Sequence, residues 1–593
     1  MVYTLDGDQR VYVGESIHAV TRMQQHLQRR ERDHLEVARV IVDPTFNKSA
    51  CLDLESFLIA LFAGDGKFQV DNANAGLTGS NYYDRDAYRG RFREIFDRLR
   101  AEGMFDGTIT QIENGDLFKL SPFKTLNYEQ RVIVVRIVEA FLTDLRGDRS
   151  TTSVIQGQPG TGKTIVGIYL MKLLSDIRGA VPLEDSDSDD VFSGFFTEEN
   201  AALLADTRMG LVVPQQSLRE TVKKVFKRTS GLHQGMVLSP TQVGGRADEY
   251  DLLLVDETHR LQQLSATMAI KRFREINRKL FDGDEAGGHQ LDWIRRKSRH
   301  RILLLDPEQS IRPASDLPSA VLRGLEAEAS TAGRLFPLTT QMRVRAGEDY
   351  VAYVRDILSE DPPDPALFSQ YEFRLFDDLS DMRAAIADRE DEIGLSRLIA
   401  GYAWEWRSKS NPHLFDIEIG DLQLRWNVSD TDWISSPTSV DEVGSIHTTQ
   451  GYDLNYAGVI IGPDLRYDPS AKLLHIDRSS YFDKAGKRSN KMLGLDVTDE
   501  MLQTYIINIY RVLLTRGIRG TYVYVCDDDL RDYLAEFIAH AEPPIGASRS
   551  MLPMPDLHFD QASQDPTSPD TFRVELGEAA GTGRPHDMRP DRL

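Results

Sequence analysis

The sequence predicts an α/β protein in which two parallel-sheet domains follow a small α+β unit. A glycine-rich loop at 157–164 lies between an apolar, β-branched run and a helical stretch. Apolar runs then alternate with helical stretches up to residue 305, and a second alternating series extends from 445 to 525. Such alternation is typical of crossover connections in parallel sheets, and wholly apolar central strands indicate burial on both faces.

The chain length and composition indicate a multidomain globular protein. A typical domain size of about 150 residues predicts three or four domains in 593 residues. With 41% hydrophobic residues, the chain contains no apolar stretch long enough to span a bilayer and no signal-peptide pattern. The two cysteines, Cys51 and Cys526, lie far apart and form no metal-ligand spacing. We therefore expect two core cysteines in a cytoplasmic protein without a membrane segment.

The net charge of −22 is unevenly distributed. Residues 176–199 contain eight acidic residues and one basic residue, and residues 541–593 contain nine and five. Both segments have the composition of disordered chain. In contrast, the segments 219–228, 271–279 and 295–301 are rich in basic residues. Each basic run is either a solvated helix face or part of a track for a phosphate backbone, and the sequence leaves both open.

The first 83 residues are expected to form a separate unit of short strands and helices. Its predicted elements are strands at 2–5, 11–14 and 39–43 and helices at 17–30 and 52–62. A connector at 84–126 follows. Its predicted elements are a helix at 85–100 and two short strands near Thr108 and Leu117.

The two large domains are predicted at 127–335 and 336–540. The first begins with an amphipathic helix at 128–145 and carries an acidic insertion near 176–199. Its predicted strands after the glycine-rich loop are 210–213, 251–255 and 301–305, and those of the second domain are 445–447, 458–461 and 520–525. The Pro-rich segment 541–593 is predicted to be a poorly ordered tail.

The glycine-rich loop has the sequence of a phosphate-binding loop. Gly157, Gly160 and Gly162 let backbone N–H groups turn inward around phosphate oxygens. Lys163 supplies a positive charge to the β- and γ-phosphates, and Thr164 supplies a hydroxyl to Mg²⁺. The N-terminus of the following helix adds its dipole. The chain is therefore predicted to bind a nucleoside triphosphate.

A second acidic element follows a buried strand, as triphosphate hydrolysis requires. Asp256 would hold the metal ion, and Glu257 would orient or deprotonate the attacking water. Gln309, after the next strand, could contact the γ-phosphate. Arg343 and Arg516 each lie at a predicted domain edge, where a guanidinium group can stabilise charge on a transferring phosphoryl group.

In this order the motifs resemble those of superfamily 1 helicases, and more narrowly the Schlafen-group-3-like DNA/RNA helicase family. The resemblance covers about 127–540 and includes Asn127-Tyr128-Glu129-Gln130, in which Gln130 would read adenine. The further matching motifs are SIHTTQG at 445–451, GVIIGP at 458–463 and YRVLLTRGIR at 510–519. The resemblance implies two RecA-like P-loop NTPase domains that bind ATP and Mg²⁺ and move along single-stranded DNA or RNA, with DNA favoured. The residues before Gln309 lack the glycine that usually precedes Asp306.

Several residues are candidate contacts for the nucleic acid. Thr241, Thr448 and Thr449 could bind backbone phosphates. Four tryptophans could stack on bases or belong to the core, and the core is favoured for most of them. These are Trp404, Trp406, Trp426 and Trp433.

The N-terminal unit resembles the GIY-YIG nucleases. The matching residues are Tyr3, Tyr12, Arg22 and Glu55, with a candidate asparagine at Asn72 or Asn74. The resemblance implies that a tyrosine acts as general base or orients water, Arg22 neutralises the scissile phosphate, and Glu55 binds Mg²⁺. The first half-motif, Met1-Val2-Tyr3, lacks its glycine. His26 could carry a proton or be an ordinary, partly buried histidine.

Together these features predict an ATP-dependent nucleic-acid translocase or helicase fused to a Mg²⁺-dependent endonuclease. Analogy with nuclease–helicase fusions suggests that it processes or restricts DNA, foreign DNA included, in antiviral defence. One alternative is a nucleic-acid-stimulated ATPase switch whose N-terminal unit binds DNA without cleaving it. A second is a P-loop ATPase that remodels proteins.

Overall fold

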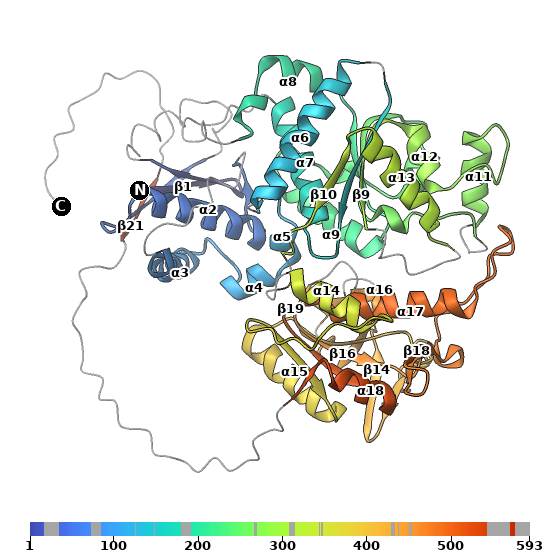
Figure 1. Ribbon diagram of the computed structural model, residues 1–593. Coiled ribbons are helices and arrows are strands. Elements are labelled where there is room, and N and C mark those ends of the chain that lie inside the picture. Colours follow the sequence, from blue (N-terminus) through green and yellow to red (C-terminus); the bar gives the residue numbers. More distant parts are fainter. Residues whose placement is uncertain are drawn as a thin grey trace, which may run out of the picture. The chain divides into compact units, whose positions relative to one another are not determined.

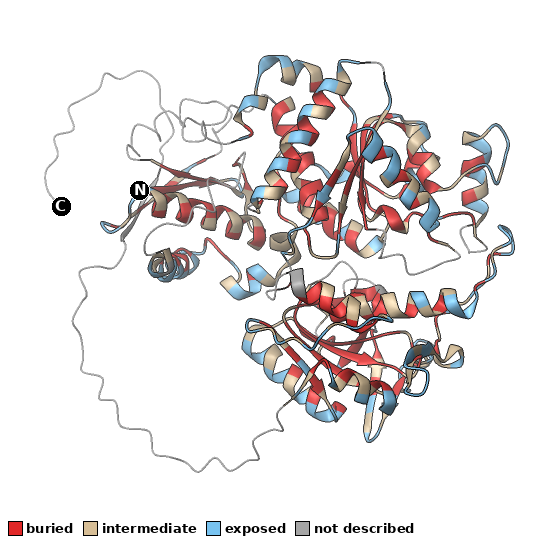
Figure 2. Cartoon of the chain, in the orientation of Figure 1, coloured by how far each residue is buried: buried red, intermediate tan, exposed pale blue. Residues whose placement is uncertain are grey.

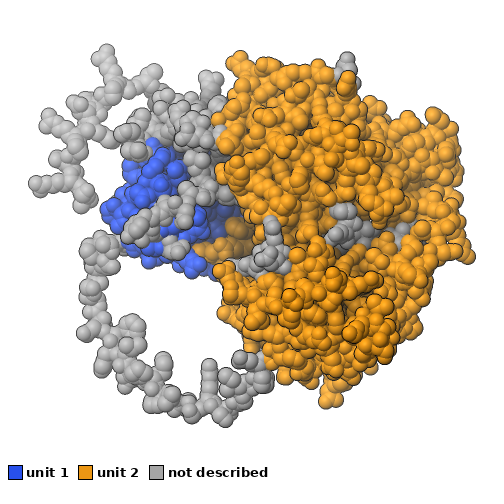
Figure 3. Space-filling view, in the orientation of Figure 1, with its two compact units in different colours: residues 1–108, 559–593 blue, residues 109–558 orange. Residues whose placement is uncertain are grey.

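The polypeptide divides into two compact units, residues 1–108 with 559–593 and residues 109–558 (Figure 3). The structure is a computed structural model. It describes residues 1–16, 35–72, 85–124, 126–147, 149–179, 191–265, 270–306, 315–342, 344, 348–428, 433–436, 438–449, 453–484, 486–541 and 570–575. No helix in these ranges is long and apolar enough to cross a membrane.

The first unit is an α+β structure built on a mainly antiparallel sheet (Figure 1). Its strands are β1 Val2–Gly7, β2 Arg10–Glu15, β3 Val37–Val42, β4 Gln69–Val70 and β21 Asp570–Glu575, in the order β21-β3-β1-β2-β4. Its helices are α2 Lys48–Asp65 and α3 Arg85–Ala101. Asn47 caps α2, because its side chain accepts a hydrogen bond from the backbone N–H of Ala50.

Two predictions for this unit need correction. The unit extends past residue 83 because α3 packs on α2: Arg85 bonds to Asp53, and Phe57 lies against Phe92. In the segment predicted as a poorly ordered tail, β21 pairs antiparallel with β3. A short β-prone run gives no local signal of a partner more than 500 residues away.

The second unit contains two parallel sheets, each with helices, which we call the first and second lobes (Figure 1). The strands of the first lobe are β5 Thr151–Gly157, β6 Met209–Val212, β7 Val237–Leu238, β8 Tyr250–Val255, β9 Ser298–Leu305 and β10 Leu335–Leu338, in the order β10-β5-β9-β8-β6-β7. Its helices are α6 Tyr128–Leu145, α7 Lys163–Arg178, α8 Glu198–Leu204, α9 Gln216–Arg228, α10 Pro240–Gly245, α11 Ile270–Leu280, α12 Gln290–Lys297 and α13 Ser319–Thr331. Short 3-10 turns lie at Ser193–Phe195, Gln234–Met236 and Thr258–Arg260.

Both faces of the first sheet are buried, as Figure 2 shows for its strands. On β8, Leu252 and Leu254 belong to the core with α6 and α7, whereas Leu253 and Val255 belong to the core with α12 and α13. Side chains alternate between the faces of a strand, so an unbroken apolar run fills two cores. The predicted parallel sheet is confirmed here, since each neighbouring pair of strands is parallel.

The second lobe has its own parallel sheet with one antiparallel edge. Its strands are β11 Glu372–Phe376, β12 Ser396–Ala400, β13 Ile417–Ile419, β14 Leu422–Trp426, β15 Glu442–Ser445, β16 Leu454–Ile461, β19 Gly517–Val525 and β20 Ala539–His540, in the order β13-β14-β15-β12-β16-β19-β11-β20. Its helices are α14 Glu348–Ile357, α15 Leu379–Ile393, α16 Ile446–Thr449, α17 Asp499–Leu514 and α18 Asp528–Ala535. A hairpin, β17 Leu465–Asp468 and β18 Leu473–Ile476, and turns at Trp433–Ser435 and Arg478–Ser480 complete it.

The connector forms helices where the sequence suggested strands near Thr108 and Leu117. The structure has α4 Ile109–Asn114 and α5 Asp116–Lys119. The β-branched cluster at 108–110 favours a strand locally. However, Asp116 follows Gly115 at the start of a helical turn, and α5 packs against α9. The acidic insertion predicted near 176–199 has helical ends, because α7 continues to Arg178 and α8 begins at Glu198.

Candidate active site

The phosphate-binding loop joins β5 to α7, as the sequence predicted. Gly160 and Gly162 have φ values of +86° and +83°, in the left-handed region that favours glycine. A Cβ atom at Gly162 would lie 2.5 Å from Nε2 of Gln130. The glycines therefore allow both the turn and the close approach of α6 to the loop.

Lys163 folds back over this loop. Its Nζ donates hydrogen bonds to the carbonyl oxygens of Gly157 (2.5 Å) and Gln158 (3.0 Å), and it lies 3.6 Å from Oδ2 of Asp306. The side chain is buried at the loop that would surround a phosphate. Charged phosphate oxygens are stronger acceptors than carbonyl oxygens, so a bound triphosphate would compete for the ammonium group.

Thr164 and Asp256 meet where a magnesium ion would bind. The Thr164 hydroxyl donates to Oδ2 of Asp256 at 2.9 Å, across the ends of α7 and β8. Burial raises the pKa of Asp256 to about 7, and the neighbouring charge of Glu257 acts in the same direction. A hydroxyl beside a buried carboxylate fits the oxygen ligands that Mg²⁺ prefers.

Glu257 carries its carboxylate at the end of β8 with a left-handed backbone, φ +46°. Its Oε2 lies 2.9 Å from Nε2 of His259 and 3.4 Å from Nε of Arg260. Burial by itself would raise the pKa of Glu257, but the side chains of His259, Arg260 and Lys163 hold it well below its usual range. An ionised carboxylate can accept a proton from water or orient it. His259 lies two residues after Glu257 in the sequence but was not predicted to belong to the site.

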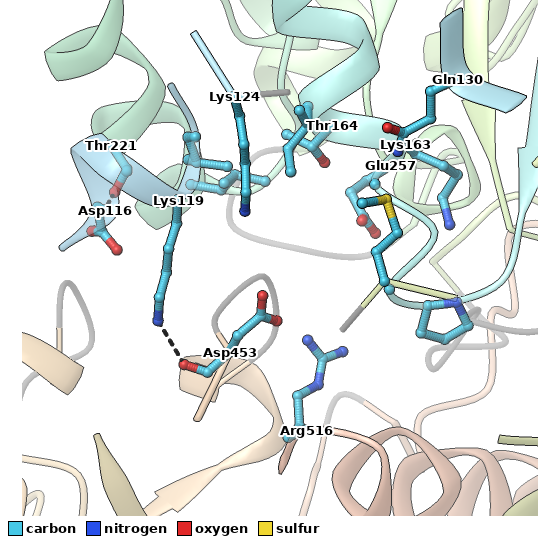
Figure 4. A pocket seen from close by; sticks show the side chains of 17 residues that line it. Asp116, Lys119, Lys124, Gln130, Lys163, Thr164, Thr221, Glu257, Asp453 and Arg516 are labelled. Atoms are coloured by element: carbon cyan, nitrogen blue, oxygen red, sulfur yellow. Dashed lines mark hydrogen bonds between the residues drawn. The ribbon is translucent and has the colours of Figure 1, made fainter. Parts of the chain in front are cut away.

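These groups open into a cleft that the second lobe completes (Figure 4). The lining residues with polar functional groups are Gln130, Lys163, Thr164, Thr221 and Glu257 from the first lobe, Asp453 and Arg516 from the second, and Asp116, Lys119 and Lys124 from the connector. Arg516 follows α17 and is buried. Figure 4 shows its guanidinium group directed into the cleft.

The segment that follows β10 and leads to the second lobe contacts the phosphate-binding loop directly. The backbone N–H of Met342 donates to the carbonyl oxygen of Gly160 (2.9 Å), and the side chain of Gln341 donates to that of Pro159 (2.6 Å). Arg343 comes next in sequence but lies outside the described residues, as does Gln309. Their predicted contacts with the γ-phosphate stay predictions.

Gln130, predicted to read adenine, is bound to the protein itself. Its Oε1 accepts from the backbone N–H of Asn127 (3.1 Å), which forms a capping box at the start of α6. Its Nε2 donates to the carbonyl oxygen of Thr161 (3.0 Å). Gln130 thus connects the α6 N-terminus to the phosphate-binding loop, and its role toward a base stays a prediction.

The connector also contributes residues to the site, which was not predicted from the sequence. Asp116, Lys119 and Lys124 line the cleft, and the Lys119 ammonium donates to the carbonyl oxygen of Asp453 at 3.0 Å. Short segments without a repeated motif carry no signal of this kind in a single sequence.

Some candidate nucleic-acid contacts are committed to internal bonds. Thr448 bonds to Ser445 and Asn427, and Thr449 donates to the carbonyl oxygen of Ser445. Both threonines are buried. Trp426 and Trp433 are also fully buried, which confirms the core interpretation for these two tryptophans, whereas Trp404 and Trp406 are half-buried.

The N-terminal unit brings some of its predicted site residues together. Tyr3 on β1 pairs with Gly14 on β2, and the rings of Tyr3 and Tyr12 lie 6.2 Å apart. A Cβ atom at Gly14 would lie 2.6 Å from the Tyr3 ring, so glycine is needed there. Glu55 lies on α2, which packs against β2.

The remaining features of this predicted site are structural or outside the described residues. Tyr3 is fully buried and belongs to a small core with Tyr12. The Asn72 amide exchanges two hydrogen bonds with the backbone of Val13, so it extends the sheet. Arg22, His26 and Asn74 lie outside the described residues.

Comparisons with known proteins agree with the order of the motifs. The model of the Schlafen group 3, DNA/RNA helicase domain matches residues 150–527, more than half of the chain. An uncharacterized protein of Saccharomyces cerevisiae, YPL245W, is 26% identical over 444 residues, which cover 69% of this chain and 90% of the yeast protein.

Solved helicase structures are more distant. Arterivirus nonstructural protein 10, a helicase, aligns at 13% identity with a TM-score of 0.25 and 68% of this chain covered. The match spans 64% of the arterivirus protein. The Pif1 helicase from Bacteroides, in complex with ADP-AlF3 and ssDNA, aligns at 10% identity with a TM-score of 0.23, over 68% of this chain and 92% of the Pif1 chain.

Proposed function

The chain belongs to the Schlafen group 3 DNA/RNA helicase domain family, and on this premise we propose that it hydrolyses ATP to move along single-stranded nucleic acid, DNA in preference to RNA. The observation that carries the proposal is the cleft in which Lys163, Glu257 and Arg516 converge from two lobes. A site built from two lobes can couple hydrolysis to movement of one lobe against the other, as two RecA-like domains would.

Each cleft residue has a role in this proposal. Lys163 binds the β- and γ-phosphates, and Glu257 orients the attacking water and accepts its proton. Thr164 and Asp256 would hold Mg²⁺, which supplies charge neutralisation to the phosphate oxygens when bound. Arg516, from the second lobe, stabilises the charge that develops on the transferring phosphoryl group.

Steady-state ATP hydrolysis by the full chain tests this proposal. We expect hydrolysis to rise at least tenfold on addition of single-stranded DNA or RNA and to be lost in Lys163→Ala. A Lys472→Met variant is the control, because this exposed lysine lies in the β17–β18 turn. Hydrolysis that is indifferent to added single strands would favour the alternative of an ATPase that remodels proteins.

For the N-terminal unit we propose Mg²⁺-dependent phosphodiester cleavage, with Tyr12 and Glu55 as its first candidate residues. The supporting observation is that Gly14 leaves room for Tyr3 beside Tyr12, on strands against which α2, the helix that carries Glu55, packs. In this proposal Tyr12 orients or deprotonates water, Glu55 binds the metal ion, and Arg22 neutralises the scissile phosphate.

A nicking assay separates this activity from the alternative of a switch that binds DNA without cutting it. Supercoiled DNA and structured RNA are incubated with the full chain and Mg²⁺ or Mn²⁺. We expect wild type to nick and Tyr12→Phe and Glu55→Ala to lose nicking while ATP hydrolysis persists. The nuclease proposal fails if wild type leaves both substrates intact or if the variants nick equally well.

A further inference from the structure

The connector forms a bridge between the two lobes, and we use this name for residues 109–124. On the first-lobe side, Oδ2 of Asp116 accepts a hydrogen bond from the Thr221 hydroxyl (3.4 Å). Phe123 is buried there, with the Lys172 ammonium 5.7 Å from its ring centroid. The bridge is therefore anchored on the lobe that carries the phosphate-binding loop.

The same bridge binds the second lobe through backbone carbonyl oxygens and one side-chain amide. The Asn114 amide donates to the carbonyl oxygen of Ile393 (3.1 Å), and the Asn455 amide donates to Oδ1 of Asn114 (3.2 Å). The Lys119 ammonium donates to the carbonyl oxygen of Asp453 (3.0 Å). A movement of the second lobe must therefore stretch or break contacts with the bridge.

Lys124 extends from the end of the bridge into the cleft that Thr164 also lines, and Figure 4 labels both side chains. Burial lowers the pKa of Lys124, whereas the charge of Asp453 acts in the opposite direction. A desolvated ammonium group is costly unless an anion lies near it. The Asp453 carboxylate of the second lobe lines the same cleft as Lys124.

A bound triphosphate would bring a stronger anion to this position. The cationic lining residues are Lys119, Lys124, Lys163 and Arg516, and the acidic ones are Asp116, Glu257 and Asp453. A nucleoside triphosphate carries about four negative charges at neutral pH, whereas a diphosphate carries about three. The terminal phosphate is what distinguishes them, and a cation that lines the cleft together with Lys163 and Thr164 can contact it.

We propose that Lys124 binds the terminal phosphate of a nucleoside triphosphate and that Asp453 competes with this phosphate for the lysine. The bridge then makes the cleft selective for triphosphate over diphosphate. Because phosphate binding draws Lys124 away from Asp453, the bridge also transmits nucleotide binding to the second lobe. This inference rests on the nucleotide site proposed above, but Lys124 belongs to none of the sequence motifs that define that site.

The two residues should act in opposite directions. Lys124→Met removes the contact and should weaken triphosphate binding about tenfold while changing diphosphate binding less than twofold, because a charge-assisted contact is lost only with the terminal phosphate. Lys124→Arg should restore most of the preference. Asp453→Asn removes the competing charge but keeps the carbonyl oxygen that Lys119 binds, so it should tighten triphosphate binding.

The experiment measures the Kd of fluorescent AMP-PNP and fluorescent ADP in the presence of Mg²⁺ for the full chain, with Lys472→Met as the control. The inference is overturned if the ratio of the Kd for AMP-PNP to the Kd for ADP is the same in Lys124→Met as in wild type. If Lys124→Met does not fold, Asp453→Asn decides, and unchanged or weaker AMP-PNP binding overturns the inference. Wild-type protein that binds neither nucleotide overturns the nucleotide site as well.

Discussion

The nucleotide cleft and the tyrosine cluster of the N-terminal unit use their chemical groups in different ways. In the cleft, Lys163, Glu257 and Arg516 line a pocket between two lobes. In the N-terminal unit, Tyr3 is part of a closed core and Asn72 is bonded to a neighbouring strand. Both sets come from recognisable sequence patterns, so the pattern alone does not establish catalysis at either place.

What separates the two regions is the cost of keeping polar groups where they are. The cleft maintains the buried carboxylate of Asp256 beside the partly exposed carboxylate of Glu257, with the pKa of Asp256 shifted upward and that of Glu257 downward. Such an arrangement is expensive for folding and is expected where chemistry requires it. In the N-terminal unit the tyrosine rings pack in a small core, and so contribute to stability as well as to the proposed cleavage.

The largest effect on ATP hydrolysis is expected from substitution of Glu257, the proposed general base. Glu257→Gln keeps the size of the side chain but cannot accept a proton from water. We expect kcat for ATP hydrolysis to fall by about 10² to 10⁴, the usual contribution of a general base. Triphosphate binding, measured by equilibrium titration, should remain within about threefold of wild type.

Glu55→Gln is the matched control from the other region. It should leave ATP hydrolysis unchanged, because Glu55 lies in the separate N-terminal unit. Equal losses of hydrolysis in the two variants would remove the distinction between the regions.

A smaller effect is expected when the phosphate-binding loop is strained. Gly162→Ala places a Cβ atom 2.5 Å from the Gln130 amide at a φ of +83°. We expect a loss of about 1–3 kcal/mol in stability together with weaker nucleotide binding, measured by chemical denaturation and titration.

Gly103→Ala provides the comparison, since Gly103 has a similar φ of +81° with nothing near its Cβ position. It should show the backbone cost, about 1–2 kcal/mol, with normal nucleotide binding. Normal nucleotide binding in Gly162→Ala would contradict the tight fit between α6 and the loop.

A further effect concerns the pH dependence of stability without nucleotide and metal ion. The pKa of Asp256 is about 7 in the folded protein and about 3.9 in an unfolded chain. Because the folded state holds the proton more tightly, this stabilisation is complete below about pH 4 and is lost as the pH rises through about 7.

Asp256→Asn stays uncharged over this range. The urea midpoint of wild type should therefore fall more steeply than that of Asp256→Asn between pH 5 and pH 8. Parallel pH profiles for the two proteins would show that the carboxylate is not perturbed by burial.

Much of the cleft could be predicted because its residues are neighbours in sequence. Lys163 and Thr164 begin the helix after the loop, and Asp256 and Glu257 end a buried strand, so each pair is positioned by one local element. The parallel sheets were also predictable from local sequence. A strand whose two faces both pack against core residues has a continuous apolar sequence.

The parts that could not be predicted depend on distant contacts. The chain near Thr108 and Leu117 was predicted to form two short strands, whereas its helices are fixed by contacts with α9 and the second lobe. Lys124 and Asp453 are 329 positions apart in sequence, yet both line the cleft. No local pattern relates such residues, nor does one relate β21 to β3.

The central claim is that the cleft drives movement along a single strand, and a translocation assay tests it most directly. Oligonucleotides of increasing length carry a fluorophore at the 5′ or the 3′ end, and arrival of the protein is followed by stopped flow after ATP is added. The account predicts a lag that grows with length for one labelled end, is absent with AMP-PNP, and is absent in Glu257→Gln. ATP hydrolysis stimulated by single strands without any length-dependent lag would contradict movement and leave a nucleic-acid-gated switch.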